Sequence, residues 1–257
     1  MPGCVGCRDG AEDFGLAMAF QPIVDVEDRC VVAYEALVRG SNGEGAGKVL
    51  SRVTPENRYA FDQQCRVAAI EQSVEAGIVD TGARLSINFL PNAVYSPVAC
   101  IQLTLKTARA AGLPVDRLVF EFTENERMAD TAHVATIIET YRRMGFATAL
   151  DDFGAGHAGL GLLAKLQTDV VKLDMELIRG IDASMSRRMI VDGIVRMLGR
   201  MDIGVIVEGV ETVEEYRALR DIGLRYFQGY LFARPALRAL PPVHYPDADV
   251  STVRAVA

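Results

Sequence analysis

Histidine is nearly absent from this chain, whose 257 residues include only His133, His157 and His244. No two of them form an HxxxH pattern, and none belongs to a His-Asp dipeptide. Zinc hydrolases bind their metal largely through histidine, and the His-Asp type of metal phosphohydrolase depends on that dipeptide. The shortage therefore argues against both enzyme classes.

Cysteine is also sparse, with five residues in the chain. Cys30, Cys65 and Cys100 lie in apolar or helix-patterned segments, which indicates reduced thiols rather than a disulfide framework. Cys4 and Cys7 form a single CxxC, and chance in a flexible tail, half of a zinc site and a redox pair all remain open for it. A complete zinc site needs further ligands, and the chain has no second CxxC.

Long apolar runs and excess positive charge are missing too. No apolar run approaches the roughly 18 residues of a membrane helix, and the first residues lack the pattern of a signal peptide. The 27 basic residues are outnumbered by 34 acidic ones, giving a net charge of −7, whereas proteins that bind nucleic-acid polymers are usually basic. We expect a cytoplasmic protein with no membrane span and no DNA or RNA polymer as partner.

What the chain has is the composition of a large folded domain, 50% hydrophobic and 24% charged. Apolar runs typical of strands lie at 31–38, 85–89, 118–122, 147–150, 170–173, 205–207 and 226–227. Helical spacing separates them at 59–76, 98–111, 131–144, 184–200 and 213–222, with a short segment at 160–166.

This alternation of strand and helix predicts an α/β fold, with a parallel sheet and helices outside it. Seven or eight such units favour a single-domain TIM-like (β/α)8 barrel over an open doubly wound sheet. The expected boundaries are an N-terminal tail over 1–15, the barrel over 16–240 and a C-terminal tail over 241–257.

Polar side chains fall within or directly after the apolar runs, namely Glu35, Asn88, Glu121, Asp151, Asp152, Lys172 and Glu208. The carboxyl ends of barrel strands meet at one mouth, where the five carboxylates would repel one another. Oxygen ligands suit Mg²⁺ or Mn²⁺, so one or two such cations are predicted there. Lys172 in the run VVKLD either stabilises developing negative charge or forms an ordinary ion pair.

The segment Gly154–Gly159 also reads as GxGxxG after a strand, with Asp174 following at the distance of a dinucleotide-binding acid. We reject that interpretation because Asp151 and Asp152 directly precede the glycines and would repel a pyrophosphate in the absence of cations. It also leaves Lys172 without a role.

Seven short motifs follow one another along the chain: YEALVRG (34–40), SINFLPN (86–92), FEFTE (120–124), LDDFGAG (150–156), VKLD (171–174), VEGVET (207–212) and FQGYLFARP (227–235). Together they resemble the EAL-domain cyclic di-GMP phosphodiesterases. The resemblance implies a TIM-like barrel that hydrolyses one phosphodiester bond of cyclic di-GMP to linear 5′-pGpG. It also implies a homodimer and two Mg²⁺ or Mn²⁺ ions that share the attacking water.

Carried over by motif position, the resemblance implies the metal ligands Glu35, Asn88, Glu121, Asp151, Asp152 and Glu208, with Asp151 bridging both ions. Lys172 would contact the attacking water and Glu211 would assist it, so that Lys172, Glu211 and Glu35 form the catalytic set. Gln21, Arg39 and Gln228 would serve the substrate, and Glu124 would hold the loop after Asp152. The alternative is an inactive EAL-type receptor or partner-binding module. Such proteins usually lack a metal-site residue, and here none is missing.

Overall fold

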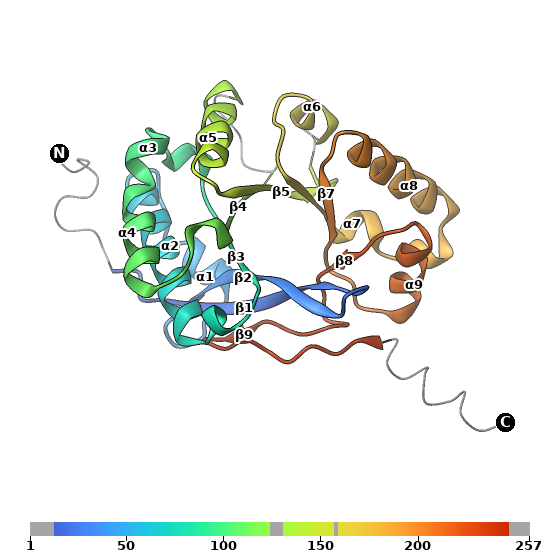
Figure 1. The fold of residues 1–257 in the computed structure, drawn as a ribbon, viewed down its shortest axis with the longest axis horizontal. Helices are drawn as coiled ribbons and strands as arrows, with labels where there is room; N and C mark the ends of the chain where they lie inside the picture. Colours follow the sequence, from blue (N-terminus) through green and yellow to red (C-terminus); the bar gives the residue numbers. More distant parts are fainter. Residues whose placement is uncertain (1–12, 124–130, 157–158, 247–257) are drawn as a thin grey trace.

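The computed structural model describes residues 13–123, 131–156 and 159–246, and in this part of the chain strands form a closed barrel with helices outside it (Figure 1). The barrel strands are β1 (Leu16–Asp25), β2 (Cys30–Gly40), β3 (Arg84–Asn88), β4 (Leu118–Thr123), β5 (Ala147–Phe153), β6 (Val170–Leu173), β7 (Gly204–Val207) and β8 (Tyr226–Phe227). The short β9 (Ala236–Leu237) pairs with β1. The predicted barrel is confirmed.

The prediction of a wholly parallel sheet is wrong at the first strand. Strands β2 to β8 are parallel, but β1 runs antiparallel to both β2 and β8 and closes the barrel between them. A turn over 26–29 joins β1 to β2, and so short a connection permits only an antiparallel pair. Asp25 Oδ1 accepts the N–H groups of Glu27 and Asp28 at 3.0 and 3.2 Å and thereby shapes this turn.

The helices around the barrel are α1 (Ala46–Leu50), α2 (Arg58–Glu75), α3 (Pro97–Cys100), α4 (Gln102–Ala111), α5 (Thr131–Arg143), α6 (Gly159–Leu163), α7 (Met175–Ile178), α8 (Met185–Arg200) and α9 (Val213–Asp221). Helix α8 begins where Ser184 accepts the N–H of Arg187, and α9 begins where Thr212 accepts that of Glu215. The helix predicted over 98–111 is divided at Ile101 into α3 and α4.

A buried ion pair lies between the barrel and its helices. Arg66 and Asp62, one turn apart on α2, are 2.8 Å apart between Nη2 and Oδ2, and neither side chain is more than 1% exposed. Arg66 also lies over the rings of Phe89 and Phe120 and donates to the hydroxyl of Tyr141 at 3.1 Å. Asp62 accepts the backbone N–H of Leu90 at 2.9 Å, so the pair fixes the chain directly after β3.

The expected tails, 1–15 and 241–257, lie partly outside the described residues, and Cys4 and Cys7 of the CxxC lie wholly outside them. Val243 and Tyr245, which we expected in the C-terminal tail, pack against the barrel core. Tyr245 also lies under the guanidinium of Arg29, at 4.9 Å from ring centre to Cζ. Within the described ranges no helix is both long and apolar enough to cross a membrane.

Candidate active site

A pocket of about 470 Å³ opens at the carboxyl ends of the barrel strands. Eight of the predicted site residues line it, namely Gln21, Glu35, Asn88, Asp151, Asp152, Glu208, Glu211 and Gln228. They come from six different segments of the chain, and only the closed barrel brings them together. Of the seven polar residues expected to meet at one mouth, five line this pocket, namely Glu35, Asn88, Asp151, Asp152 and Glu208.

Lys172 lies at the base of this group, on β6, and its side chain has no exposed surface. Its Nζ lies 2.6 Å from Glu208 Oε1 and 2.8 Å from Glu121 Oε2. Two further carboxylate oxygens lie close to it, Asp151 Oδ1 at 3.2 Å and Glu35 Oε2 at 3.3 Å. One ammonium thus faces four carboxylates, so the group carries a large excess of negative charge.

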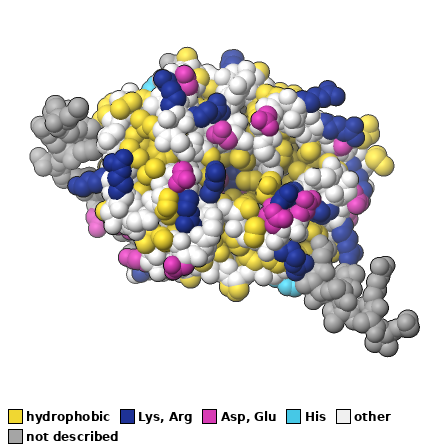
Figure 2. Space-filling model, in the orientation of Figure 1, with side chains coloured by type: hydrophobic (Ala, Val, Ile, Leu, Met, Phe, Trp, Pro, Cys, Tyr) yellow, Lys and Arg dark blue, Asp and Glu magenta, His cyan; other side chains and the backbone are white. Residues whose placement is uncertain are grey.

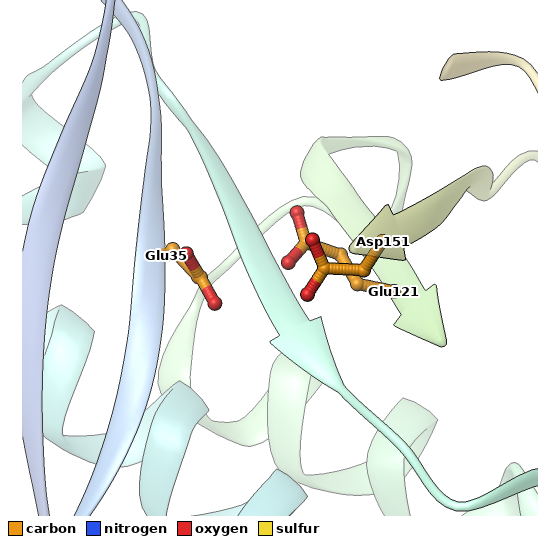
Figure 3. A group of neighbouring side chains, drawn as sticks. All are labelled: Glu35, Glu121 and Asp151. Atoms are coloured by element: carbon orange, nitrogen blue, oxygen red, sulfur yellow. The ribbon is translucent and has the colours of Figure 1, made fainter. Parts of the chain in front are cut away.

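Three of these carboxylates enter from neighbouring parts of the barrel wall and point toward one another (Figure 3). Glu35 stands on β2, Glu121 on β4 and Asp151 on β5. Oxygen atoms of these three residues lie within 4.8 Å of one another, and those of Asp151, Asp152 and Glu208 do the same. The two groups share Asp151.

A local irregularity of β5 lets two consecutive aspartates serve one pocket. Side chains of a regular strand alternate between its two faces, so Asp151 and Asp152 should point apart. The register between β5 and β6 shifts between Leu150 and Phe153, and Asp152 has a left-handed φ of 55°. Both aspartates consequently line the pocket. This backbone conformation is unusual outside glycine and costs on the order of 1 kcal/mol, as strained functional sites often do.

Amide side chains fix Glu35 from two sides. Asn88 Nδ2 donates to Glu35 Oε1 at 2.8 Å, and Gln228 Nε2 donates to Glu35 Oε2 at 2.7 Å. Gln228 Nε2 also lies 3.3 Å from Gln21 Oε1. The side-chain oxygen Oε1 of Gln228 and Oδ1 of Asp151 are buried, yet neither accepts a hydrogen bond in the described part of the chain.

The electrostatic balance of the site follows from burial and crowding. Burial opposes the positive charge of Lys172, but the surrounding carboxylates outweigh it and raise the pKa of the ammonium well above its usual range. Burial raises the pKa of Glu121 to about 8, and Glu35 and Asp151 add to the effect against the opposing charge of Lys172. Burial likewise raises the pKa of Glu208 well above its ordinary value. The single positive charge of Lys172 therefore does not balance the negative charge of the surrounding carboxylates.

This donor set fits divalent cations that prefer oxygen. It offers five carboxylates and the amide of Asn88, with Asp151 common to both carboxylate groups. Oxygen ligands without sulfur or imidazole suit Mg²⁺ or Mn²⁺. Asp151 Oδ1 lies 3.2 Å from Lys172 Nζ but accepts no hydrogen bond in the described part of the chain, so this oxygen can also bind a cation.

Sequence reasoning missed several residues in and next to the pocket. Ser86 Oγ donates a short hydrogen bond to Glu121 Oε1, and it stands on β3 two residues before Asn88. Strand alternation puts Ser86 and Asn88 on the same face, which is the signal that would have found it. Tyr230 lines the pocket near Gln228, and the guanidinium of Arg234 lies 4.2 Å from its ring centre. The quoted motif FQGYLFARP contains both.

Three predicted residues stand apart from the carboxylate group. Arg39 Nη1 donates to the carbonyl of Val38 at 2.8 Å, and Arg39 lines a neighbouring apolar pocket between β2 and helices α1 and α2. Glu211 lines the 470 Å³ pocket but pairs with Arg179 at 3.2 Å. Glu124 lies outside the described residues.

Comparison with known proteins shows a family model that matches most of the chain. Residues 8–235 match the family model described as EAL domain. The blue light- and temperature-regulated antirepressor BluF of Escherichia coli (strain K12) is 31% identical over 229 residues, which cover 89% of this chain and 56% of BluF. The chain therefore spans little more than half the length of this relative.

Two solved structures have the same architecture. The c-di-GMP bound form of a standalone versatile EAL protein from Vibrio cholerae O395 matches with a TM-score of 0.87 and 46% identity, covering 91% of this chain and 97% of that one. The pH 6 manganese/cy-diGMP complex of Klebsiella pneumoniae BlrP1 matches with a TM-score of 0.83 and 34% identity, covering 89% of this chain and 58% of that one.

Proposed function

The chain belongs to the EAL domain family, and from this membership we propose that it hydrolyses one phosphodiester bond of cyclic di-GMP to linear 5′-pGpG. The observation that carries the proposal is the group of carboxylates around Asp151, which keeps every oxygen ligand that the family motif implies. Related solved structures contain cyclic di-GMP, and one of them contains manganese as well. The substrate, the reaction and the location in the cytoplasm are parts of this proposal.

We propose two divalent cations, Mg²⁺ or Mn²⁺, held by Glu35, Asn88, Glu121, Asp151, Asp152 and Glu208. Such cations lower the pKa of a shared water molecule and neutralise the charge that builds up on the phosphate. Gln228 and Asn88 would keep Glu35 oriented through the hydrogen bonds they already donate to it. Ser86 would do the same for Glu121.

Lys172 would keep its proton throughout, because the carboxylates around it raise its pKa. Its ammonium then supplies a fixed positive charge beneath the site where the water attacks, and stabilises the negative charge of the transition state. Glu211 and Gln21 line the pocket and would meet the water and the dinucleotide there. Arg39 would have to leave the carbonyl of Val38 to bind the substrate.

Product analysis tests this function. Purified protein is incubated with cyclic di-GMP after chelation of metals, and then with Mg²⁺, Mn²⁺ or Ca²⁺, and pGpG is separated from GMP. We expect pGpG with Mg²⁺ or Mn²⁺, none after chelation, and little with Ca²⁺, which accepts looser geometry. Full activity in metal-stripped protein would rule out the two-metal mechanism.

A second function is favoured by one specific observation, the role of BluF as an antirepressor. In that case the chain would bind cyclic di-GMP or a protein partner without turnover. Calorimetry with cyclic di-GMP in the presence of Mg²⁺ distinguishes the two functions, because a receptor gives stable binding without product, whereas the proposed enzyme releases pGpG.

A further inference from the structure

A second cavity, of about 290 Å³, occupies the opposite half of the barrel interior. We call it the lower cavity; its lining includes Ala33, Arg84, Ser86, Ala149, Gly204 and Tyr226. The residues above it stand two positions further along the same strands, since Glu35 follows Ala33, Asn88 follows Ser86 and Asp151 follows Ala149. The lower cavity is therefore the next layer of inward-facing positions beneath the carboxylates.

The lower cavity exists because its lining side chains are small. Barrels of this class normally fill their interior with layers of bulky branched residues. Here Ala33, Ala147, Ala149 and Gly204 contribute little volume to the layer. A Cβ atom on Gly204 would meet only Asp169 O at 3.5 Å and Val170 Cγ2 at 3.6 Å, which are ordinary contacts. Close backbone packing therefore does not require glycine at this position.

The chemistry of the lower cavity is apolar with one cation at the rim. Ile23, Val119 and Val170 add to its apolar wall. The exposed Arg84 begins β3 at the open end, and it forms no ion pair with any residue that the structure describes. At the inner end, Ser86 and Glu121 hydrogen-bond to each other. In Figure 2 the face in view is hollowed near its centre, and hydrophobic and basic side chains border the hollow.

We propose that the lower cavity binds a small apolar carboxylate, with its hydrocarbon inside the barrel and its carboxylate on the Arg84 guanidinium. An apolar protein cavity of roughly half this volume remains dry and takes up benzene. The lower cavity therefore has room for an aryl or branched alkyl group. An arginine at the rim selects a carboxylate because its donors match both oxygens. The inner end of such a ligand would contact Ser86, directly beneath a predicted metal ligand.

Calorimetry with the metal-free whole chain tests the site, using 3-phenylpropionate as the probe and the uncharged 3-phenylpropionamide as its match. We expect both to bind, the carboxylate more tightly. Gly204→Ile fills the cavity from its rim without a backbone clash, so it should abolish binding of both probes. Arg84→Met should weaken the carboxylate about threefold to tenfold and leave the amide unchanged.

Circular dichroism and thermal melting show whether each variant is folded, and Ala149→Leu provides a second cavity-filling variant at the inner end. Absence of probe binding to the wild-type chain would overturn the proposal. So would undiminished binding in folded Gly204→Ile and Ala149→Leu, because the probe would then occupy another place. None of these measurements involves cyclic di-GMP or a metal, so their outcome is independent of the proposed hydrolysis.

Discussion

Lys172 Nζ and Glu208 Oε1, which lie 2.6 Å apart, form the shortest of four ion pairs that converge on one buried ammonium. The pairing joins β6 to the residue directly after β7, its neighbouring strand. Removal of the ammonium would leave four carboxylates facing one another without a fixed positive charge. Lys172 therefore contributes both to the stability of the metal-free barrel and to the proposed chemistry.

Lys172→Met should lower the maximal rate by about 10²- to 10³-fold while leaving affinity for cyclic di-GMP nearly unchanged, because the charge acts in the transition state. Rate is measured with Mg²⁺ and affinity with Ca²⁺. The metal-free variant should also lose about 3–5 kcal/mol of unfolding free energy, as when one partner of a buried ion pair is removed. A variant with weaker binding and a normal maximal rate would contradict this role.

Glu35→Ala should abolish detectable turnover, because it removes a predicted metal ligand and also leaves two amide donors, Asn88 and Gln228, without their acceptor. Metal affinity, followed by calorimetry with Mn²⁺, should fall at the same time. Glu139→Ala is the matched control, since Glu139 is an exposed residue of α5 that pairs with Arg143 and lies outside the pocket. Equal Mn²⁺ affinity in Glu35→Ala and the control would reject Glu35 as a ligand.

The metal-free protein should lose stability as the pH rises from about 4.5 to about 8. Burial raises the pKa of Glu121 from 4.5 to about 8, so the folded state binds more protons than the unfolded state in this interval. The stabilising contribution is complete below the lower value and is lost as the pH passes the upper one. Thermal melting in chelator should show this slope, and Glu121→Gln should reduce it. A rise in melting temperature over the same interval would contradict the assignment.

The buried pair of Asp62 and Arg66 should matter for stability and for the loop after β3. Asp62→Asn should cost about 3–5 kcal/mol, because it leaves Arg66 buried without a counter-charge. The double variant Asp62→Leu with Arg66→Met should recover much of this loss, since apolar replacement of a buried pair is often neutral. Urea unfolding gives both values. A double variant no more stable than Asp62→Asn would show that the pair itself is required.

The role of Glu124 remains a prediction, because this residue lies outside the described residues. The homodimer is a second prediction that no observation above tests. The segment from Gly154 through α6 is the expected contact, and Leu160 on α6 is 60% exposed. Leu160→Glu should shift the chain to monomer in sedimentation, and Glu124→Ala should lower metal affinity and rate in a folded protein. If Glu124→Ala kept the dimer affinity and the metal affinity of the wild-type chain, Glu124 would not hold the loop after Asp152 in the way the resemblance implies.

The sequence alone predicts most of the barrel because parallel strands buried on both faces are apolar runs. Strand β1 escaped that reasoning, since its interior contains Gln21 and Pro22 and its direction depends on pairing with β2 and β8. The site could be identified from polar residues inside these apolar runs, because a polar side chain in a strand buried on both faces is rare without a function.

Contacts between distant side chains were beyond reach of sequence reasoning. The pairing of Lys172 with four carboxylates depends on barrel closure, and the joint orientation of Asp151 and Asp152 depends on the register shift in β5. The hydrogen bond of Arg39 to Val38 and the ion pair of Glu211 with Arg179 depend on rotamers and loop paths. Motif position identifies such residues but does not give their partners.

The barrel's seam has a consequence for the order of folding. Strand β1 pairs with β2 over its whole length through a local turn, but with β8 only at Val24 and Asp25. The β1–β2 hairpin can form early, whereas the pairing with β8 joins opposite ends of the chain and carries a large loop-closure cost. Gln21 and Gln228 approach Glu35 from the two sides of this seam, so the pocket reaches its final geometry only in the last step of folding. Amide hydrogen exchange should therefore be fastest, among the barrel strands, at Tyr226 and Phe227.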